Sequence, residues 1–557
     1  MPKIEVSQKD LCGLIGRKLS VEQLRDEVMY AKGELDEVNG DLLKLDMKDT
    51  NRPDTWSAEG VAREIKARYK PSGLPKYILK KSKFVVHVDK STEKVTPYVS
   101  GSGRLQTVCA VVKGLKINEA VLSQIIQLQE KVGGTLGRNR KEVSIGVYDL
   151  HKIKFPVTFR AIGPREIKFV PLGLADKMTP QEILEKHPKG KEYGHLLANQ
   201  AVYPLFIDSA KEVLSMPPII NSNHSGRVTE HTKDVFIECS GFDNKLLNTA
   251  LDVLVAALYD RGGTVYSVKV KYGNKTTNTP DFAPKKFYVN TDYIRKIAGI
   301  ELADKQIIDL LRKSLYDAKI KGKRIELLYP AYRQDIMHER DIVEDVLISY
   351  GFNNMEPVVP HINTKGGVAK THIIAKRIAR IMAGAGFQEV MSYTLTNREN
   401  LYDKMQTSGD LIEIENPMSS NWSVFRTSLL PGLLEFFTDN MHHEYPQMVF
   451  EIGNTLATAD TETRTKDVDK IAGAITATEV NYEMISSYLD ALMRNLGIQY
   501  KLQKSSHKSF IEGRTAEIIV NGKPVGFIGE MHPNVLNNWR LEKPVVAFEI
   551  NLGEIFE

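Results

Sequence analysis

The chain has 557 residues, 42% of them hydrophobic and 26% charged, and its 75 basic and 70 acidic residues give a net charge of +5. At roughly 100–200 residues per domain, this length predicts about three or four domains. The composition excludes collagen-like, coiled-coil and wholly disordered chains, while the near-balanced charge neither requires nor excludes a nucleic-acid partner.

The three cysteines, Cys12, Cys109 and Cys239, lie far apart and form no CxxC pair. This spacing predicts neither a disulfide framework nor a structural zinc site, and it indicates a reduced, cytoplasmic setting. No apolar run approaches the roughly 20 residues that a membrane span needs, so we expect no membrane association. The first 30 residues mix charges with short apolar steps, which predicts a folded start rather than a signal peptide.

The first half of the chain is expected to alternate helices and strands. Ser20 and Gln23 form a capping-box pattern, and Ser57 is placed to cap a further helix. The run FVVHV (84–88) has the composition of a strand. The clearest helix follows Asp243, because its leucines and alanines recur on one face.

Two glycines, Gly262 and Gly263, are expected to end that helix before a strand, TVYSVKVKY (264–272), which has period-two alternation. The segment 274–284, NKTTNTPDFAP, is rich in Asn, Thr and Pro and predicts a domain boundary.

Residues 286–352 predict a compact α+β unit in the order strand, helix, helix, strand, helix. Pro357 and Pro360 indicate a linker after it. The last part, 361–557, alternates helices with strands such as VMSYTLT and QMVFEIG. There, Asn521-Gly522 predicts a two-residue hairpin turn.

The most informative stretch is YRQDIMHERDIVEDVLISYG (332–351). At about 100° per residue, Asp341, Glu344 and Asp345 share one helix face, opposite an apolar face. Asp335 is expected to be the helix N-cap, where a carboxylate meets free backbone N–H groups. The commoner interpretation of such a face is a solvated acidic surface. The alternative is a magnesium site, because Mg²⁺ prefers oxygen ligands and keeps several waters.

Eight segments in order along the chain carry a resemblance to a known family. The sequence resembles the β subunits of phenylalanyl-tRNA synthetases of the archaeal and eukaryotic type, over nearly its whole length. The matching segments are LCGLIGRKLS, NRPDTWSAEGVAR, LGRNRKEVSIGVYDLHKI, PPIINSNHSGRVTEHTKDVFIECSG, YRQDIMHERDIVEDVLISYGFNN, VFRTSLLPGLLE, FEIGNTL and GEMHPNVLNNW.

The resemblance implies a multidomain fold of the α+β and α/β classes. Its implied domains are an N-terminal structural domain (1–85), an editing domain that hydrolyses misacylated tRNA (86–280), a small α+β domain with a magnesium-binding acidic helix (281–358), and a catalytically inactive class II synthetase-like antiparallel-sheet module (359–557). The working enzyme is then an α2β2 heterotetramer with the α subunit, which uses ATP to attach phenylalanine to tRNA(Phe). The positions that match the family's magnesium ligands, at a site shared with the α subunit, are Asp335, Asp341, Glu344 and Asp345.

The C-terminal module departs from the pattern of an active class II synthetase. In the stretch Phe425-Arg426-Thr427-Ser428 the arginine of the motif is present, but Ser428 stands where the acid two residues later belongs, and the glycine-rich third motif has no match. The resemblance therefore implies that adenylate formation belongs to the α subunit, and Arg426 is expected to serve structure or the subunit interface.

An editing domain has a physical motive, because a pocket for phenylalanine rejects tyrosine by only about a hundredfold. We expect Ser215, Glu238 and Ser240 to line the editing pocket, since Glu238 and Ser240 alternate on one strand face. The alternative is that Ser215 caps a turn and Glu238 is half-exposed. Family members often carry Asp and Thr near 238 and 240, which keeps open a second function, a non-catalytic assembly and tRNA-positioning scaffold without an active editing site.

The glycines around 133–137, together with Arg138 and Arg140, could cradle a phosphate, but they lack motif spacing and favour an ordinary loop. The basic residues that crowd 131–168 would suit the acceptor end of tRNA, although a solvated face is the commoner interpretation.

Overall fold

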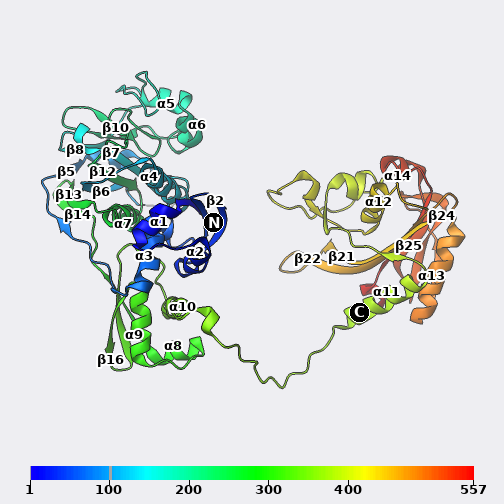
Figure 1. The fold of residues 1–557 in the computed structure, drawn as a ribbon. Coiled ribbons are helices and arrows are strands. Elements are labelled where there is room, and N and C mark those ends of the chain that lie inside the picture. Colours follow the sequence, from blue (N-terminus) through cyan, green and yellow to red (C-terminus); the bar gives the residue numbers. More distant parts are fainter. Residues whose placement is uncertain (1, 100–102, 557) are drawn as a thin grey trace. The chain divides into compact units, whose positions relative to one another are not determined.

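The computed structural model describes residues 2–99 and 103–556. The chain forms two compact units, Met1–Val358 and Val359–Glu557, each with its own sheets and helices (Figure 1). In these described ranges, no helix combines the length and the apolar character that a membrane crossing requires.

The N-terminal part of the first unit is a small antiparallel sheet in the order β1-β3-β2, covered by three helices. The predicted capping box is confirmed, because Ser20 and Gln23 each bond the other's backbone N–H. Ser57 also caps its helix, accepting a hydrogen bond from the backbone N–H of Gly60. The elements are β1 (Lys3–Ser7), α1 (Gln8–Ile15), α2 (Val21–Val28), β2 (Gly33–Asn39), β3 (Leu42–Met47) and α3 (Ala58–Tyr69).

The central part is an eleven-stranded sheet whose main path runs β11-β10-β9-β8-β5-β13-β6-β12-β7, with β4 and β14 paired to β13. Helix α7, which the leucine pattern predicts, packs on β6 and β12, and the side chain of Asp243 caps its N-terminus. Its strands are β4 (Leu79–Lys80), β5 (Val85–Val88), β6 (Gln106–Lys113), β7 (Val143–Asp149), β8 (Val157–Ile162), β9 (Tyr203–Ile207), β10 (Val213–Met216), β11 (Ile220–Asn221), β12 (Val235–Gly241), β13 (Thr264–Tyr272) and β14 (Lys275–Thr279). Its helices are α4 (Glu119–Lys131), α5 (Pro180–Lys186), α6 (Pro188–Tyr193) and α7 (Asn244–Asp260).

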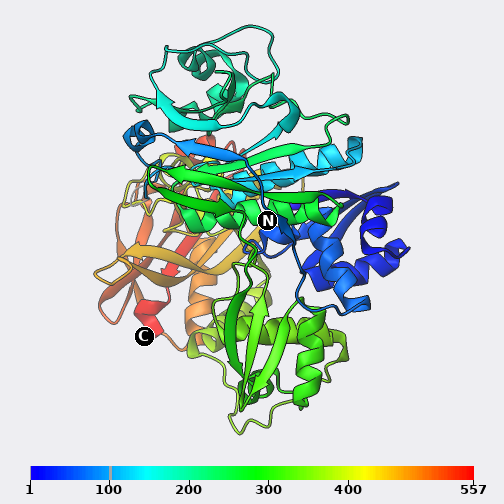
Figure 2. The same cartoon turned by 90° about the vertical axis from the view of Figure 1, so that its left-hand side faces the viewer.

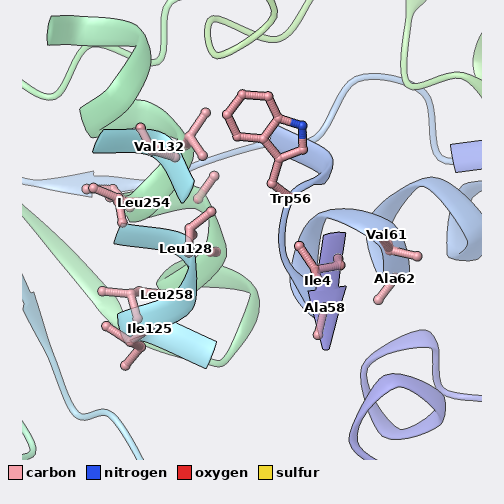
Figure 3. Close-up of a cluster of buried hydrophobic side chains, with 14 of the residues drawn as sticks. Ile4, Trp56, Ala58, Val61, Ala62, Ile125, Leu128, Val132, Leu254 and Leu258 are labelled. Carbon is pink, nitrogen blue, oxygen red and sulfur yellow. The ribbon is translucent and has the colours of Figure 1, made fainter. Parts of the chain in front are cut away.

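The N-terminal and central parts share one hydrophobic core. Trp56 has no exposed surface and belongs to the same cluster of buried side chains as Leu254 and Leu258 of α7. Figure 3 shows this cluster, with Ile125 and Leu128 of α4 beside the leucines of α7. The first 70 residues are therefore held to the large sheet by apolar burial as well as by the chain itself.

The third part is a three-stranded antiparallel sheet in the order β15-β17-β16, packed against helices (Figure 2). The predicted order of elements is correct except for one additional strand, β16. Its elements are β15 (Lys285–Asn290), α8 (Thr291–Ala298), α9 (Asp304–Lys313), β16 (Asp317–Lys321), β17 (Arg324–Tyr329) and α10 (Glu339–Tyr350).

The second unit is built on a seven-stranded sheet, β18-β21-β22-β26-β25-β24-β23, in which only the short β18 runs parallel to its neighbour. One sheet face packs against α11 and α13, and the other against α12 and α14. The predicted hairpin turn joins β24 to β25, and Asn521 and Gly522 both have positive φ angles, as such a turn requires. Of the predicted strand VMSYTLT, only Leu395–Thr396 is a strand.

The elements of the second unit are α11 (Lys370–Gly384), β18 (Gln388–Glu389), β19 (Leu395–Thr396), β20 (Val424–Phe425), α12 (Leu430–Asp439), β21 (Gln447–Thr458), β22 (Thr465–Thr476), α13 (Tyr482–Leu496), β23 (Tyr500–Lys504), β24 (Phe510–Val520), β25 (Lys523–Met531), α14 (Pro533–Asn538), β26 (Val545–Asn551) and α15 (Gly553–Phe556).

The segment 274–284, predicted as a domain boundary, contains strand β14, whose threonines pair with β13 before the chain leaves the large sheet and enters β15. One local expectation is wrong. Asp335 is not the cap of the acidic helix, since α10 begins at Glu339 and His338 caps it by accepting a hydrogen bond from the backbone N–H of Arg340.

Candidate functional site

Glu238 of β12 lies in the wall of a cavity of about 300 Å³ in the first unit. The remaining walls are mainly apolar and come from strand β7, helix α4 and the loop before β11. They include Ile125, Ile145, Val147, Leu172, Pro217, Pro218 and Ile219. The cavity thus combines an apolar slot with a single buried carboxylate.

The residues predicted to form a pocket meet through Tyr148, which the sequence did not single out. Tyr148 Oη lies 3.0 Å from Glu238 Oε1 and 2.7 Å from Ser215 Oγ, within hydrogen-bond distance of both. On the other side, Ser240 Oγ is 2.5 Å from Glu238 Oε2. Ser215, Glu238 and Ser240 are therefore brought together, but of these three only Glu238 lines the cavity. The half-exposed alternative for Glu238 is wrong, since only 1% of the residue is exposed.

Burial controls the ionisation of this cluster. It raises the pKa of the Glu238 carboxyl to about 7, although hydrogen bonds from Ser240 and Tyr148 favour the ionised form. The unfolded chain would ionise the same group near its ordinary value of 4.5, so this burial reduces stability as the pH rises from 4.5 towards 7. Burial also raises the pKa of Tyr148 well above its ordinary value, which keeps its hydroxyl a donor at neutral pH.

Gly146 of β7 leaves the space that this cluster occupies. It lies opposite Glu238 in the β7–β12 register. A Cβ atom at this position would collide with Tyr148 Oη and would lie 2.6 Å from Glu238 Oε1. Only glycine therefore allows the tyrosine and the carboxylate to meet over the strand.

The mouth of the cavity is basic. Arg140 Nη1 donates hydrogen bonds to the carbonyl oxygens of Pro218, at 3.1 Å, and Ile219, at 2.9 Å, and so fixes one wall. Lys189 and Arg227 also line the cavity. The glycine-rich segment that sequence reasoning treated as an ordinary loop forms part of this rim, because Gly133 and Gly134 line it as well.

Asp341, Glu344 and Asp345, predicted to share one outer face of helix α10, do not do so. Asp345 is only 3% exposed, and its Oδ2 is 2.9 Å from Arg333 Nη1 and accepts a hydrogen bond from Tyr316 Oη. Asp335 is buried too and forms an ion pair with Arg333. Burial alone would raise the pKa of the Asp345 carboxyl, but Arg333 and Lys32 hold it below its ordinary value. The predicted solvated triad is wrong because a buried guanidinium, 1% exposed, needs counter-charges.

The other two acids face outward. Asp341 Oδ2 accepts hydrogen bonds from the backbone N–H groups of Met337 and His338, at 2.7 and 2.6 Å. Glu344 is half-exposed, with its Oε2 3.3 Å from Lys32 Nζ. Across the described ranges, no group of three or more His, Cys, Asp or Glu side chains is arranged to hold a metal ion. The four-residue magnesium site that the resemblance implies therefore stays a prediction.

In the second unit, Arg426 and Ser428 are both used by internal contacts. Arg426 Nη1 is 2.6 Å from Glu451 Oε1, and both residues are buried. Ser428 Oγ donates to Glu549 Oε2 at 2.7 Å, and Glu549 in turn pairs with Lys470. The charges of Arg426 and Glu549 are thus each neutralised by a partner within the unit.

Comparison with known proteins places these features in one family. Residues 117–257 match the B3/4 domain, 287–352 the tRNA synthetase B5 domain, and 355–552 the phenylalanyl tRNA synthetase beta chain CLM domain. The chain is 49% identical to the phenylalanine–tRNA ligase beta subunit of Pyrococcus abyssi and 50% identical to that of Pyrococcus horikoshii, with all of both sequences covered in each case.

A solved structure extends this likeness to the fold. The crystal structure of an N-terminal fragment of the phenylalanyl-tRNA synthetase beta subunit from Pyrococcus horikoshii aligns with a TM-score of 0.60 and 52% identity. It covers 63% of this chain and all of that fragment.

The packing over Gly146 predicts that this position does not tolerate a larger side chain. Gly146→Ala should lower the free energy of unfolding by about 1–3 kcal/mol, because the new methyl group displaces Tyr148 and Glu238. Gly134→Ala is the matched control, since it lines the same cavity but its Cβ would meet no atom closer than 4.0 Å. Denaturant unfolding of both variants tests this. Equal stability of the two would mean that the cluster readily rearranges.

The burial of Asp345 predicts a large difference between neighbouring acids of α10. Asp345→Ala should destabilise the chain by about 3–5 kcal/mol, because it leaves Arg333 buried without one of its partners. Glu344→Ala should cost no more than about 1 kcal/mol, since that pair is open to water. Thermal or urea unfolding of the two variants provides the measurement. Similar costs would contradict the buried network.

Proposed function

The chain belongs to the family of phenylalanine–tRNA ligase beta subunits, and from this premise we propose how its parts divide the work of that enzyme. With an alpha subunit it attaches phenylalanine to tRNA(Phe) using ATP, in an α2β2 heterotetramer of the cytoplasm. Its own contribution is fidelity and assembly rather than amino-acid activation.

The fidelity function is hydrolysis of tyrosyl-tRNA(Phe) at the Glu238 cavity. The observation that carries it is a single buried carboxylate in the wall of a mainly apolar cavity. The slot suits an aromatic ring, and the ionised carboxylate accepts a hydrogen bond from the tyrosine hydroxyl. Phenylalanine lacks that hydroxyl, so it would keep water from the Glu238 carboxylate without supplying this additional hydrogen bond, and tyrosine would be bound in preference.

Tyr148, Ser215 and Ser240 act through Glu238. Hydrogen bonds from Tyr148 and Ser240 hold the carboxylate in one orientation and stabilise its ionised form, against the cost of burial, and Ser215 lies within hydrogen-bond distance of Tyr148 Oη. They are positioning residues, because in the described structure only Glu238 of this cluster reaches the cavity.

The basic mouth suits the end of the tRNA. Arg140, Lys189 and Arg227 would attract the terminal phosphates while the aminoacyl group enters the slot. Ser144 also lines the cavity, but its hydroxyl donates to the backbone carbonyl oxygen of Ser240 at 3.1 Å. We assign hydrolysis to a water that meets the ester in the cavity, with the protein contributing orientation rather than a covalent intermediate.

Amino-acid activation belongs to the alpha subunit. The second unit is proposed to be a class II synthetase-like module that has lost this chemistry, and its internal ion pairs support the proposal. The guanidinium of Arg426 is bound by Glu451, and Ser428 is held by Glu549, so neither is available to ATP or to a carboxylate substrate.

The outward face of α10 is proposed to meet the alpha subunit through magnesium. Asp341 and Glu344 would hold the ion, and Asp335 and Asp345 would lie behind them in the Arg333 network. A bound Mg²⁺ would neutralise two neighbouring carboxylates and so favour contact with the partner subunit.

Ionisation of Glu238 predicts the pH dependence of editing. Hydrolysis of tyrosyl-tRNA(Phe) by the complex should rise with pH through an apparent pKa near 7, since the carboxylate form binds the tyrosine hydroxyl. Glu238→Gln should slow hydrolysis at pH 8 by roughly tenfold or more and remove this step from the profile. Deacylation rates of the wild-type and Glu238→Gln complexes, measured between pH 5.5 and 8.5, test both expectations.

Glu130→Gln is the matched control, because Glu130 also lines the cavity but its side chain is 52% exposed. It should leave the profile unchanged. If Glu238→Gln reduces phenylalanylation as much as editing, the residue is structural. A complex that never deacylates tyrosyl-tRNA would favour the scaffold function instead.

The neutralised charges of the second unit predict that the full chain alone forms no aminoacyl-adenylate. Phenylalanine-dependent ATP–pyrophosphate exchange should stay at background, whereas addition of the alpha subunit restores it. Clear exchange by this chain alone would refute the assignment of activation to the alpha subunit.

A further inference from the structure

Asn221 of β11 is a polar side chain in the wall of the Glu238 cavity that the chain itself leaves without a partner. It is half-buried and lines the cavity, and its amide forms no hydrogen bond to another described group. Most other polar side chains of the wall are already paired within the chain: they are Gln129, Glu130, Arg140, Ser144, Lys189 and Glu238. A half-buried amide without an internal partner is available to a bound molecule.

The backbone that carries Asn221 is fixed on both sides. Asn221 lies directly opposite Ser215 in the β10–β11 hairpin, and its carbonyl oxygen accepts a hydrogen bond from the N–H of Leu172 at 2.9 Å. Gly226 leaves the space that the side chain needs, because a Cβ atom at Gly226 would collide with the Cβ atom of Asn221. The amide is therefore placed before any substrate arrives, which is the condition for a group that stabilises a transition state.

Asn221 lies between the buried carboxylate and the basic mouth. Paired residues of a hairpin direct their side chains to the same face, so Asn221 shares a face with Ser215 of the hydrogen-bonded Glu238 cluster. On its other side Asn221 packs near Gly226, which precedes Arg227 of the mouth. A tyrosyl ester has the same order of groups: hydroxyl, ring, ester carbonyl, and then the ribose and phosphate of the tRNA. With the hydroxyl at Glu238 and the phosphate at the mouth, the ester carbonyl comes to lie beside Asn221.

We propose that Asn221 is a catalytic residue of editing, whose side-chain Nδ2–H group donates to the carbonyl oxygen of the tyrosyl ester; this role rests on the proposed function. In the reaction a water oxygen bonds to the carbonyl carbon, which places negative charge on the carbonyl oxygen, and the amide stabilises that charge. The bond between the carbonyl carbon and the ribose oxygen then breaks, and the leaving ribose oxygen takes a proton from the attacking water. The products are tyrosine and uncharged tRNA.

Deacylation of tyrosyl-tRNA(Phe) by the complex with the alpha subunit tests this role. Asn221→Ala should lower kcat roughly a hundred- to a thousandfold, which is the usual effect of removing one such donor, and should change KM little. The amide does not titrate, so the loss should be the same at every pH, and the rise through an apparent pKa of about 7 that Glu238 causes should remain.

Asn221→Asp distinguishes the ester carbonyl from the α-ammonium group of the same substrate. Aspartate keeps an acceptor for an ammonium group but cannot donate to the carbonyl oxygen, so its kcat should fall at least as far as that of Asn221→Ala. If the aspartate variant instead keeps or exceeds the wild-type rate, Asn221 binds the ammonium group and the proposal is overturned.

Asn223→Ala is the matched control, because Asn223 follows in the same loop but is not among the described residues that line the cavity. It should leave deacylation unchanged, and all three variants should keep the phenylalanylation rate and the melting temperature of the wild-type complex.

Three results would contradict the proposal. If Asn221→Ala reduces phenylalanylation or the melting temperature as strongly as deacylation, the residue is structural. If the wild-type complex deacylates tyrosyl-tRNA and Asn221→Ala does so equally fast, the catalytic role of Asn221 alone is refuted. A wild-type complex that never deacylates tyrosyl-tRNA refutes the proposed editing function as well.

Discussion

The buried guanidinium of Arg333 is the interaction around which the first unit is organised. It pairs with Asp335 beside it in the chain and with Asp345 of helix α10, and all three residues are almost fully buried. A second buried arginine, Arg52 of the N-terminal part, lies 3.9 Å from Asp335. A charge taken out of water must be compensated nearby, so these pairs fix where the N-terminal part and the small α+β part meet.

This network also determines which carboxylates near helix α10 are already paired within the chain. Two of its four candidate ligands are already compensated within the chain, and Lys32 reaches towards both Glu344 and Asp345. Asp341 and Glu344 stay outward and available to the proposed contact with the alpha subunit. Under that proposal, assembly and internal stability use different members of one acidic motif, so neighbouring substitutions in α10 are expected to differ in kind.

The pKa of the buried carboxyl of Glu238 shifts in the opposite direction to those of Asp335 and Asp345. There the carboxylate has hydroxyl partners but no nearby cation, so its pKa rises instead of falling. A buried carboxyl group is thus kept ionised in the Arg333 network, whereas the carboxyl of Glu238 in the cavity wall has a pKa of about 7. The difference lies in whether an arginine or a tyrosine is beside the carboxyl group. In the second unit, Arg426 likewise forms an ion pair with a buried carboxylate, that of Glu451.

The sequence by itself determined the local elements and the family. Hydrophobic periodicity, side-chain caps and the Asn521-Gly522 turn are short-range effects, and they predicted α2, α3, α7, β13 and the β24–β25 hairpin correctly. The alternation of Glu238 and Ser240 on one strand was equally readable. The tertiary structure alone decided that Tyr148, about 90 residues away, completes their cluster, because strand register between β7 and β12 has no local signal. It likewise decided that Asp345 faces inward: helical spacing gives the angle of a side chain around its axis, but not which distant arginine lies in that direction.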